Sequence, residues 1–167
     1  MSQIKPYSPL NFGLIVALLA AGLDQTSKWA VVHFFALPLG QPHFVLPFWD
    51  MTFIWNRGVS YGLLDTASDM GRWLLVGLTI SIIGLLIWWL HKAQSRTEQL
   101  AFGLIIGGAL GNLVDRILYG AVVDFISLHM AGYYWYVFNI ADIWISFGVV
   151  MLLVVGFIDA RRTRAYK

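Results

Sequence analysis

The stretch that decides the fold runs from Gly107 to Asp142 and contains three short motifs. They are GGALGNLVDR at residues 107–116, VVDF at 122–125 and FNIAD at 138–142. The first motif lies inside a long apolar run, where charged side chains are expensive and therefore rare without a function. The stretch nevertheless carries Asp115, Asp124 and Asp142. We interpret Asp124 and Asp142 as a working pair that the rest of the chain holds at a membrane surface.

The composition is that of a small polytopic membrane protein. Hydrophobic residues make up 59% of the 167 residues and charged residues only 12%, which excludes an ordinary soluble domain. Four apolar segments can each supply the about 20 residues that a spanning helix needs. They cover approximately residues 10–35, 72–90, 100–118 and 141–158. We therefore predict a membrane all-α fold, a four-transmembrane-helix bundle that forms a single integral-membrane domain over residues 1–167.

The basic residues predict how the chain is oriented. If the four segments alternate across the bilayer, one side receives most of the positive charge: Lys5, Lys92, Arg96, Arg161, Arg162, Arg164 and Lys167. The positive-inside rule assigns that side, and both termini, to the cytoplasm. The regions that hold Asn56, Asp124 and Asp142 then face the periplasm or the cell exterior.

The first apolar segment is predicted to remain in the membrane rather than to be removed as a secretory signal. Its apolar character resumes through Trp29–Phe35, and Lys5 is the only basic residue before it. Within this segment, Asp24 and Lys28 are four residues apart with the acid first, the favourable order for a helical ion pair. The pair can neutralise itself in the membrane, support a functional site, or do both.

Residues 37–71 are predicted to form a periplasmic region of strands and loops. Three prolines exclude a long helix, and Phe44–Asn56 is rich in residues that favour strands, which predicts two or more short ones. The aromatic residues of this small sheet are typical of an anchor at the membrane interface, and a cradle for a substrate is the alternative. A short surface helix is expected over Leu63–Met70, between spans one and two.

The third apolar segment combines glycines with polar residues. Its glycines predict close helix packing, and they are Gly103, Gly107, Gly108 and Gly111. Unpaired charges from spans one and three would together cost on the order of 10 kcal/mol at the membrane centre, which rivals the stability of a small protein. We therefore predict a single polar layer at the outer ends of these spans. Its members are Asp24, Lys28, Asn112, Asp115 and Arg116.

Asp124 and Asp142 are predicted at one membrane depth, the first in a loop over residues 119–140 and the second in the first turn of span four. Two carboxylates a few Å apart do not both ionise easily, so they share a proton. One can then deprotonate a water while the other protonates a carbonyl. The alternatives are structural, because Asp124 could be an ordinary loop acid. Asn139 also suits a helix N-cap, with Asp142 at the third helical position, where a carboxylate is favourable.

Other chemistries have less support in the sequence. The chain has no cysteine, which excludes a thiol nucleophile and a thiolate metal site. The histidines His33, His43 and His129 show no spacing typical of metal ligands, and no spacing pairs Ser60 with Lys28. We expect no metal and no cofactor.

The motifs together resemble those of a known family. With DQTSK at residues 24–28 and NRG at 56–58, the three motifs quoted above resemble, in order, those of lipoprotein signal peptidase, the bacterial type II signal peptidase. The resemblance covers nearly the whole chain. It implies an aspartyl endopeptidase of the bacterial inner membrane that removes the signal peptide from prolipoproteins, cutting before a cysteine that carries diacylglycerol.

The resemblance also implies roles for single residues and for partners. By matching position, Asp124 and Asp142 correspond to a catalytic dyad. The implied supporting or substrate-binding residues are Asp24, Lys28, Asn56, Gly108, Asn112, Arg116 and Asn139. The implied partners are prolipoproteins, the phospholipid bilayer and the inhibitory cyclic peptide globomycin. We expect a monomer that binds no nucleic acid.

Two other classes of protein remain as alternatives. A small membrane transporter or channel subunit could use the same acids as a proton relay. However, the sequence shows no inverted repeat and no proline within any predicted span. A non-enzymatic scaffold with a structural polar layer is the third possibility.

Overall fold

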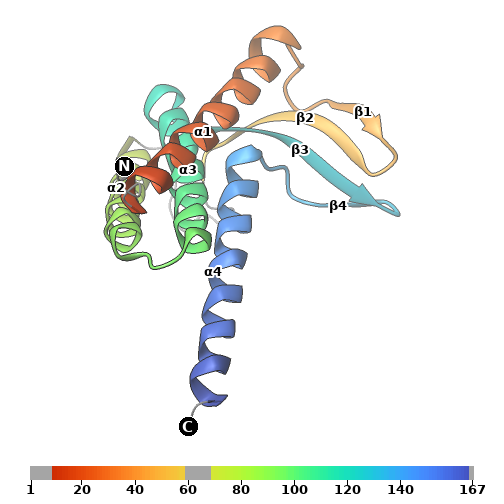
Figure 1. Ribbon diagram of the computed structural model, residues 1–167. Coiled ribbons are helices and arrows are strands. Elements are labelled where there is room, and N and C mark those ends of the chain that lie inside the picture. Colours follow the sequence, from red (N-terminus) through yellow and green to blue (C-terminus); the bar gives the residue numbers. More distant parts are fainter. Residues whose placement is uncertain (1–8, 59–68, 166–167) are drawn as a thin grey trace, which may run out of the picture.

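The computed structural model describes residues 9–58 and 69–165 (Figure 1). Along the chain, the described elements are α1 (Pro9–Trp29), a π-helical turn η1 (Ala30–Phe34), β1 (Pro42–Leu46), β2 (Trp49–Asn56), α2 (Asp69–Lys92), α3 (Arg96–Tyr119), β3 (Val122–Met130), β4 (Tyr133–Tyr134) and α4 (Ile140–Ala165). Most of the short surface helix expected over Leu63–Met70 lies outside the described residues, and Met70 belongs to α2.

Within the described ranges, four helices are long and apolar enough to cross a membrane. Their spans are Leu10–Phe34, Asp69–Lys92, Arg96–Tyr119 and Ile140–Arg161, which agree with the predicted segments to within a few residues at each end. The predicted combination of four such helices with a small antiparallel sheet is confirmed.

Helix α3 is the element on which the other helices pack, since it contacts α1, α2 and α4. It begins with a capping box: the Ser95 side chain accepts a hydrogen bond from the backbone N–H of Glu98, and the Glu98 side chain accepts one from the backbone N–H of Ser95. It ends at Gly120, whose φ of 73° is the left-handed conformation that favours glycine. Arg72 of α2 covers this end, because its Nε donates to the carbonyl of Arg116 at 2.8 Å.

The glycines of α3 allow this packing, as the sequence predicted. A Cβ added at Gly107 would lie 2.6 Å from the carbonyl oxygen of Ala17 in α1, closer than real side chains approach. A Cβ at Gly108 would meet the carbonyl oxygen of Ala141 at the start of α4. Larger residues at either position would therefore push α1 or α4 away from α3.

The sheet lies at the end of the bundle where α1 and α3 end and α4 begins (Figure 1). Its four strands are antiparallel in the order β1-β2-β3-β4. The prediction of a loop over residues 119–140 is wrong for residues 122–130, which form β3 and pair with β2 along most of their length. The physical reason is that residues 122–126, rich in valine, phenylalanine and isoleucine, favour a strand, and β2 supplies partners for their backbone groups.

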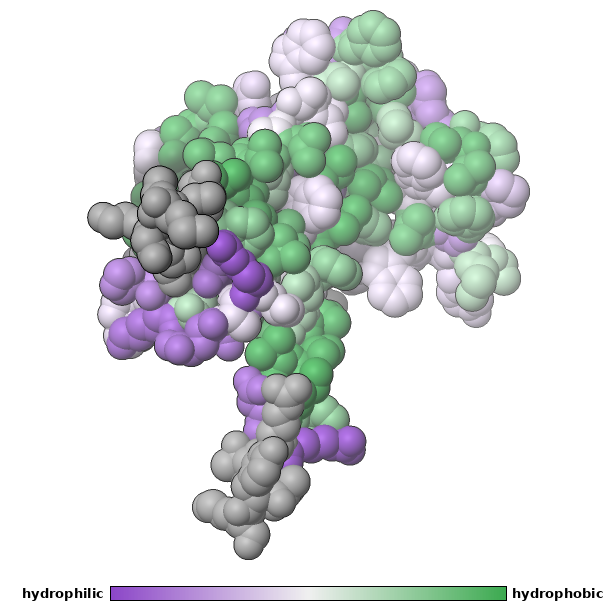
Figure 2. All heavy atoms as spheres, viewed as in Figure 1, coloured by the Kyte–Doolittle hydropathy of each residue, from purple (hydrophilic) through white to green (hydrophobic). Residues whose placement is uncertain are grey.

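Hydrophilic residues gather at two places on the surface. Figure 2 shows a mainly hydrophobic face, with hydrophilic residues gathered at the connection between α2 and α3 and towards the C-terminal end of α4. Lys92, Arg96 and Arg161 are exposed in these two places. The sheet and the start of α4 lie at the opposite end of the bundle (Figure 1). Asp124 belongs to β3, and Asp142 belongs to the first turn of α4.

Candidate active site

Asp124 and Asp142 lie where β3 and α4 begin. Asp124 is the third residue of β3 and is fully buried, whereas Asp142 is in the first turn of α4 and is only partly buried. In the register of the sheet, Asp124 faces Ile54 of β2. The short strand β4 and the following residues return the chain from β3 to α4, which brings the second acid back to the level of the first.

Two asparagine side chains connect the carboxylates. Asn139 Nδ2 donates to Asp124 Oδ1 at 2.6 Å and to Asn112 Oδ1 at 3.1 Å. Asn112 Nδ2 in turn donates to Asp142 Oδ1 at 2.9 Å. Asn112 and Asn139 are both buried, so this chain of hydrogen bonds is shielded from water and holds the two acids in one site.

Asp142 also has the structural role that the sequence allowed. Asn139 Oδ1 accepts the backbone N–H of Asp142 at 3.0 Å, and Asp142 Oδ2 accepts the backbone N–H of Asn139 at 3.2 Å. This reciprocal pair is a capping box at the start of α4. Since the other oxygen of Asp142 bonds to Asn112, capping fixes the carboxylate in place without excluding a chemical role.

The predicted polar layer is confirmed for four of its five members. Lys28 Nζ lies 2.7 Å from Asp24 Oδ2, 2.8 Å from Asp115 Oδ2 and 3.0 Å from Asn112 Oδ1. All four side chains are buried. One ammonium group therefore joins the two buried acids to the asparagine that holds Asp142.

Asp24 connects α1 to the first turn of α4. Its Oδ1 accepts the backbone N–H of Ala141 at 2.9 Å, a group that has no partner inside its own helix. The carboxylate reaches α4 because it passes Gly111 of α3, where any Cβ would collide with it. The small residue and the acid thus fit together at the point where three helices meet.

Asp115 connects the helices to the strand that carries Asp124. Its Oδ2 accepts the backbone N–H of Val123 at 3.1 Å, and its Oδ1 accepts Gln25 Nε2 at 2.8 Å. Gln25 also donates to the carbonyl of Gly111 at 3.0 Å. The sequence analysis assigned no role to Gln25, although a polar amide next to Asp24 in an apolar segment was a usable signal.

Arg116 differs from the predicted layer. Its guanidinium donates to the carbonyl of Asn112 in its own helix at 3.3 Å, and the side chain is only partly buried. Within the described part of the chain it forms no ion pair. Lys28, and not Arg116, occupies the position between Asp24 and Asp115.

Asn56 completes the surroundings of Asp124. Its Nδ2 donates to Asp124 Oδ2 at 2.8 Å, while its Oδ1 accepts the backbone N–H of Gly58 at 2.9 Å, which fixes the orientation of the amide. The predicted turn at residues 56–58 is thus present, with Gly58 at a φ of 106°. Both oxygens of Asp124 accept a hydrogen bond from an asparagine.

Burial raises the pKa of Asp124 to about 6, well above the usual range for a carboxyl group. The hydrogen bonds from Asn56 and Asn139 favour the charged form and oppose this shift, whereas the charge of Asp142 adds to it. A carboxyl that titrates close to neutral pH can exchange a proton under ordinary conditions.

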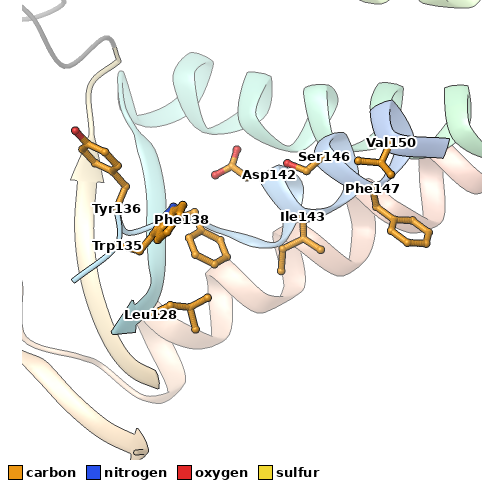
Figure 3. A pocket seen from close by; sticks show the side chains of 9 residues that line it. All are labelled: Leu128, Trp135, Tyr136, Phe138, Asp142, Ile143, Ser146, Phe147 and Val150. Atoms are coloured by element: carbon orange, nitrogen blue, oxygen red, sulfur yellow. The ribbon is translucent and has the colours of Figure 1, made fainter. Parts of the chain in front are cut away.

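Asp142 lies in the lining of an apolar groove of about 700 Å³ (Figure 3). It lies between α4 and the residues of β3 and the β4–α4 connection, and it is lined by Leu128, Trp135, Tyr136, Phe138, Asp142, Ile143, Ser146, Phe147 and Val150. Asp142 is the only charged residue in this lining. An apolar molecule in the groove would therefore meet one carboxylate, which lies between the aromatic residues that precede α4 and the apolar residues of α4 (Figure 3).

These features define a class: a protein with four potential membrane-spanning helices and paired, hydrogen-bonded carboxylates at one end of them, next to an apolar groove. The family model described as signal peptidase (SPase) II matches residues 16–158. The chain belongs to the signal peptidase II family.

Relatives and solved structures agree with this assignment. The lipoprotein signal peptidase of Methylobacterium sp. (strain 4-46) is 48% identical over 87% of this chain and 88% of its own length. That of Methylobacterium radiotolerans is 46% identical over 95% and 93%. A bacterial membrane enzyme solved by the in meso method at 2.3 Å resolution superimposes with a TM-score of 0.78 and 29% identity, over 90% of each chain. The chain is thus a multi-pass membrane protein of bacterial type.

Proposed function

We propose that this protein removes the signal peptide from prolipoproteins and that Asp124 and Asp142 perform the hydrolysis as an aspartic dyad. Membership of the signal peptidase II family supports the peptidase activity and the prolipoprotein substrate. The observation that supports the dyad is the hydrogen-bond chain that joins the two carboxylates through the buried Asn139 and Asn112, with Asp142 in the lining of an apolar groove.

In the proposed reaction, the pair carries one proton. The raised pKa of Asp124 favours its holding that proton, so Asp142, which lines the groove, acts as the base. The carboxylate takes a proton from water while the water oxygen attacks the scissile carbonyl carbon, and the protonated acid donates to the carbonyl oxygen. As the gem-diol collapses and the C–N bond breaks, Asp142 gives the proton that it took from water to the leaving amine, and Asp124 takes a proton back from a gem-diol hydroxyl, which restores the pair.

The surrounding residues position the dyad. Asn56, Asn112 and Asn139 hold the two carboxylates by direct hydrogen bonds. Asp24 holds the start of α4 through the backbone N–H of Ala141, and Lys28 donates a hydrogen bond to Asn112. Two further residues complete the set: Gly108 allows α4 to approach α3, and Arg116, whose guanidinium donates to the carbonyl of Asn112, adds a positive charge to the same helix.

The whole chain, residues 1–167, is proposed to act as one integral-membrane peptidase domain of the inner membrane, with the dyad and the sheet near the periplasmic surface. Exposed aromatic residues on and near the sheet suit the membrane interface, and they are Phe44, Phe48, Tyr133, Tyr134, Trp135 and Tyr136. A diacylglyceryl-modified substrate could then enter the groove laterally while its soluble part stays outside.

Topology is testable with reporter fusions. Lys92, Arg96 and Arg161 are exposed on the parts of the bundle away from the sheet, whereas Arg57 is the exposed arginine next to β2. Because basic residues are in excess away from the sheet, a reporter at Gln94 is expected to be cytoplasmic and one at Ala131 periplasmic. Alkaline phosphatase and green fluorescent protein fusions report the two sides independently. A periplasmic signal at Gln94 would contradict the placement of the dyad.

The activity is tested with purified protein in detergent and a synthetic lipopeptide that carries a diacylglyceryl cysteine. The expected result is cleavage immediately before the lipidated cysteine, inhibition by globomycin and no effect of a chelator. A protein that left the lipopeptide intact but moved protons across vesicle membranes would instead be a transporter, the alternative class.

Asn56→Ala is expected to change the pH dependence of cleavage. The Asn56 hydrogen bond favours the charged form of Asp124, so its loss should raise the pKa of Asp124 above about 6. If the protonated acid is required, kcat/KM of the wild-type protein falls as pH rises through about 6, and this fall moves to higher pH in the variant. We also expect slower cleavage with normal membrane insertion. An unchanged pH–rate profile would show that Asn56 does not act through Asp124.

A further inference from the structure

Ser146 lies one helical turn from Asp142, on the face of α4 that lines the groove (Figure 3). Residues four apart share a helix face, and one turn corresponds to about 5.4 Å along the axis. Since α4 begins next to Asp142 and runs away from the sheet, Ser146 is deeper in the membrane than the acid. Apart from Asp142, the other α4 residues that line the groove are apolar: Ile143, Phe147 and Val150.

The Ser146 hydroxyl has no hydrogen-bond partner among the residues that the structure describes. Three other hydroxyls in the spanning helices bond to the carbonyl one turn earlier, a common arrangement. Thr26, Thr79 and Ser81 do so at 2.7, 2.8 and 2.9 Å. Ser146 instead presents a free donor to an apolar groove, where an unbonded polar group is unfavourable. A ligand in this groove gains by offering an acceptor at that depth.

The signal peptide of a substrate has such acceptors. In lipid, its apolar segment must form a helix to satisfy its backbone, and the last four carbonyls of any helix have no partner inside the helix. At about 1.5 Å per residue, these carbonyls lie within about 6 Å of the helix end. If the scissile bond is at the dyad, the unpaired carbonyls therefore reach the depth of Ser146.

We infer that Ser146 is a substrate-binding residue whose hydroxyl donates to an unpaired backbone carbonyl in the last turn of the signal peptide. The contact sets how far the signal peptide rises in the groove, so that the scissile carbonyl stops beside Asp142. The apolar side chains of Phe147 and Val150 pack against the peptide below this contact. This inference rests on the proposed function, and it assigns the last turn of the signal peptide as the part of the substrate that binds in the groove.

The test measures cleavage of the diacylglyceryl lipopeptide by full-length Ser146→Ala in detergent. Loss of one hydrogen bond made equally in the bound substrate and the transition state should raise KM by about 2- to 10-fold with little change in kcat. Ser146→Thr keeps a hydroxyl and should restore most of the loss. Ser81→Ala is the matched control, because its hydroxyl is bonded within α2, and its KM should equal that of the wild type. Melting temperatures should be similar for all these variants.

A second substrate identifies the acceptor. Repeating the measurement with a dialkylglyceryl ether lipopeptide removes the ester carbonyls of the lipid but keeps those of the peptide. The inference predicts the same rise in KM for Ser146→Ala with both substrates. A rise confined to the ester substrate would assign the contact to the lipid, and an unchanged KM would exclude any contact; either result overturns the inference alone. Failure of the wild-type protein to cleave either substrate would contradict the proposed function and the inference with it.

Discussion

Asp124→Asn and Asp142→Asn are each expected to slow signal-peptide cleavage by about 10²–10⁴-fold, the usual contribution of a positioned acid or base. Asparagine keeps the size of aspartate and can still accept a hydrogen bond, but it can neither take nor return the proton. The lipidated precursor should accumulate in cells while the variant protein remains folded and inserted. Precursor processing and melting temperature, measured on the same variants, separate chemistry from stability.

The capping box of Asp142 provides the competing expectation. If Asp142 only stabilises the start of α4, its replacement should reduce stability by about 1 kcal/mol and leave activity largely intact. The matched control is Asp50→Asn, since Asp50 is a buried acid of β2 that lies 3.3 Å from His129 in the sheet. Its cleavage rate should stay close to that of the wild type. A stable and active Asp142→Asn protein would exclude the dyad.

Lys28→Met is expected to destabilise the protein by about 3–5 kcal/mol, the cost typical of breaking a buried ion pair by removing one partner. The substitution leaves Asp24 and Asp115 buried without their shared cation. Because Asp115 also holds the backbone of Val123, the start of β3 should loosen and cleavage should slow as well. Thermal unfolding in detergent and lipopeptide cleavage measure the two effects.

Lys92→Met is the matched control for this prediction. Lys92 is exposed at the end of α2, with its Nζ 3.6 Å from the centre of the Trp88 ring, and such exposed contacts contribute about 0.5–1 kcal/mol. Replacing Asp115 with asparagine in the Lys28→Met protein removes one of the two unpaired charges and should recover part of the stability. A Lys28→Met protein as stable as the wild type would show that the buried charges contribute nothing to the fold.

Much of this arrangement could be predicted from the sequence because a membrane leaves few solutions. Apolar segments of sufficient length predict the four helices. Charges such as those of Asp24 and Lys28 within such segments must meet partners, which led to the polar layer. The N-cap role of Asn139 followed from its position directly before the last apolar segment.

Other features depend on contacts between distant parts of the chain. Strand β3 pairs with β2, which precedes it by the whole of α2 and α3, so local sequence alone could not distinguish it from a loop. The bond from Val123 to Asp115 requires this strand to be in place. The sequence allowed either Lys28 or Arg116 to pair with Asp24 and Asp115. In the structure Lys28 forms both ion pairs, a choice that local sequence could not predict.

The central claim is that Asp124 and Asp142 act as one proton-sharing unit. Single-turnover cleavage of the lipopeptide by both single variants and by the double variant Asp124→Asn/Asp142→Asn tests it most directly. If the two carboxylates form one unit, the double variant should be little slower than either single variant, because the first substitution already disables the pair. Losses that multiply in the double variant would mean that the two acids contribute independently, which would contradict the claim.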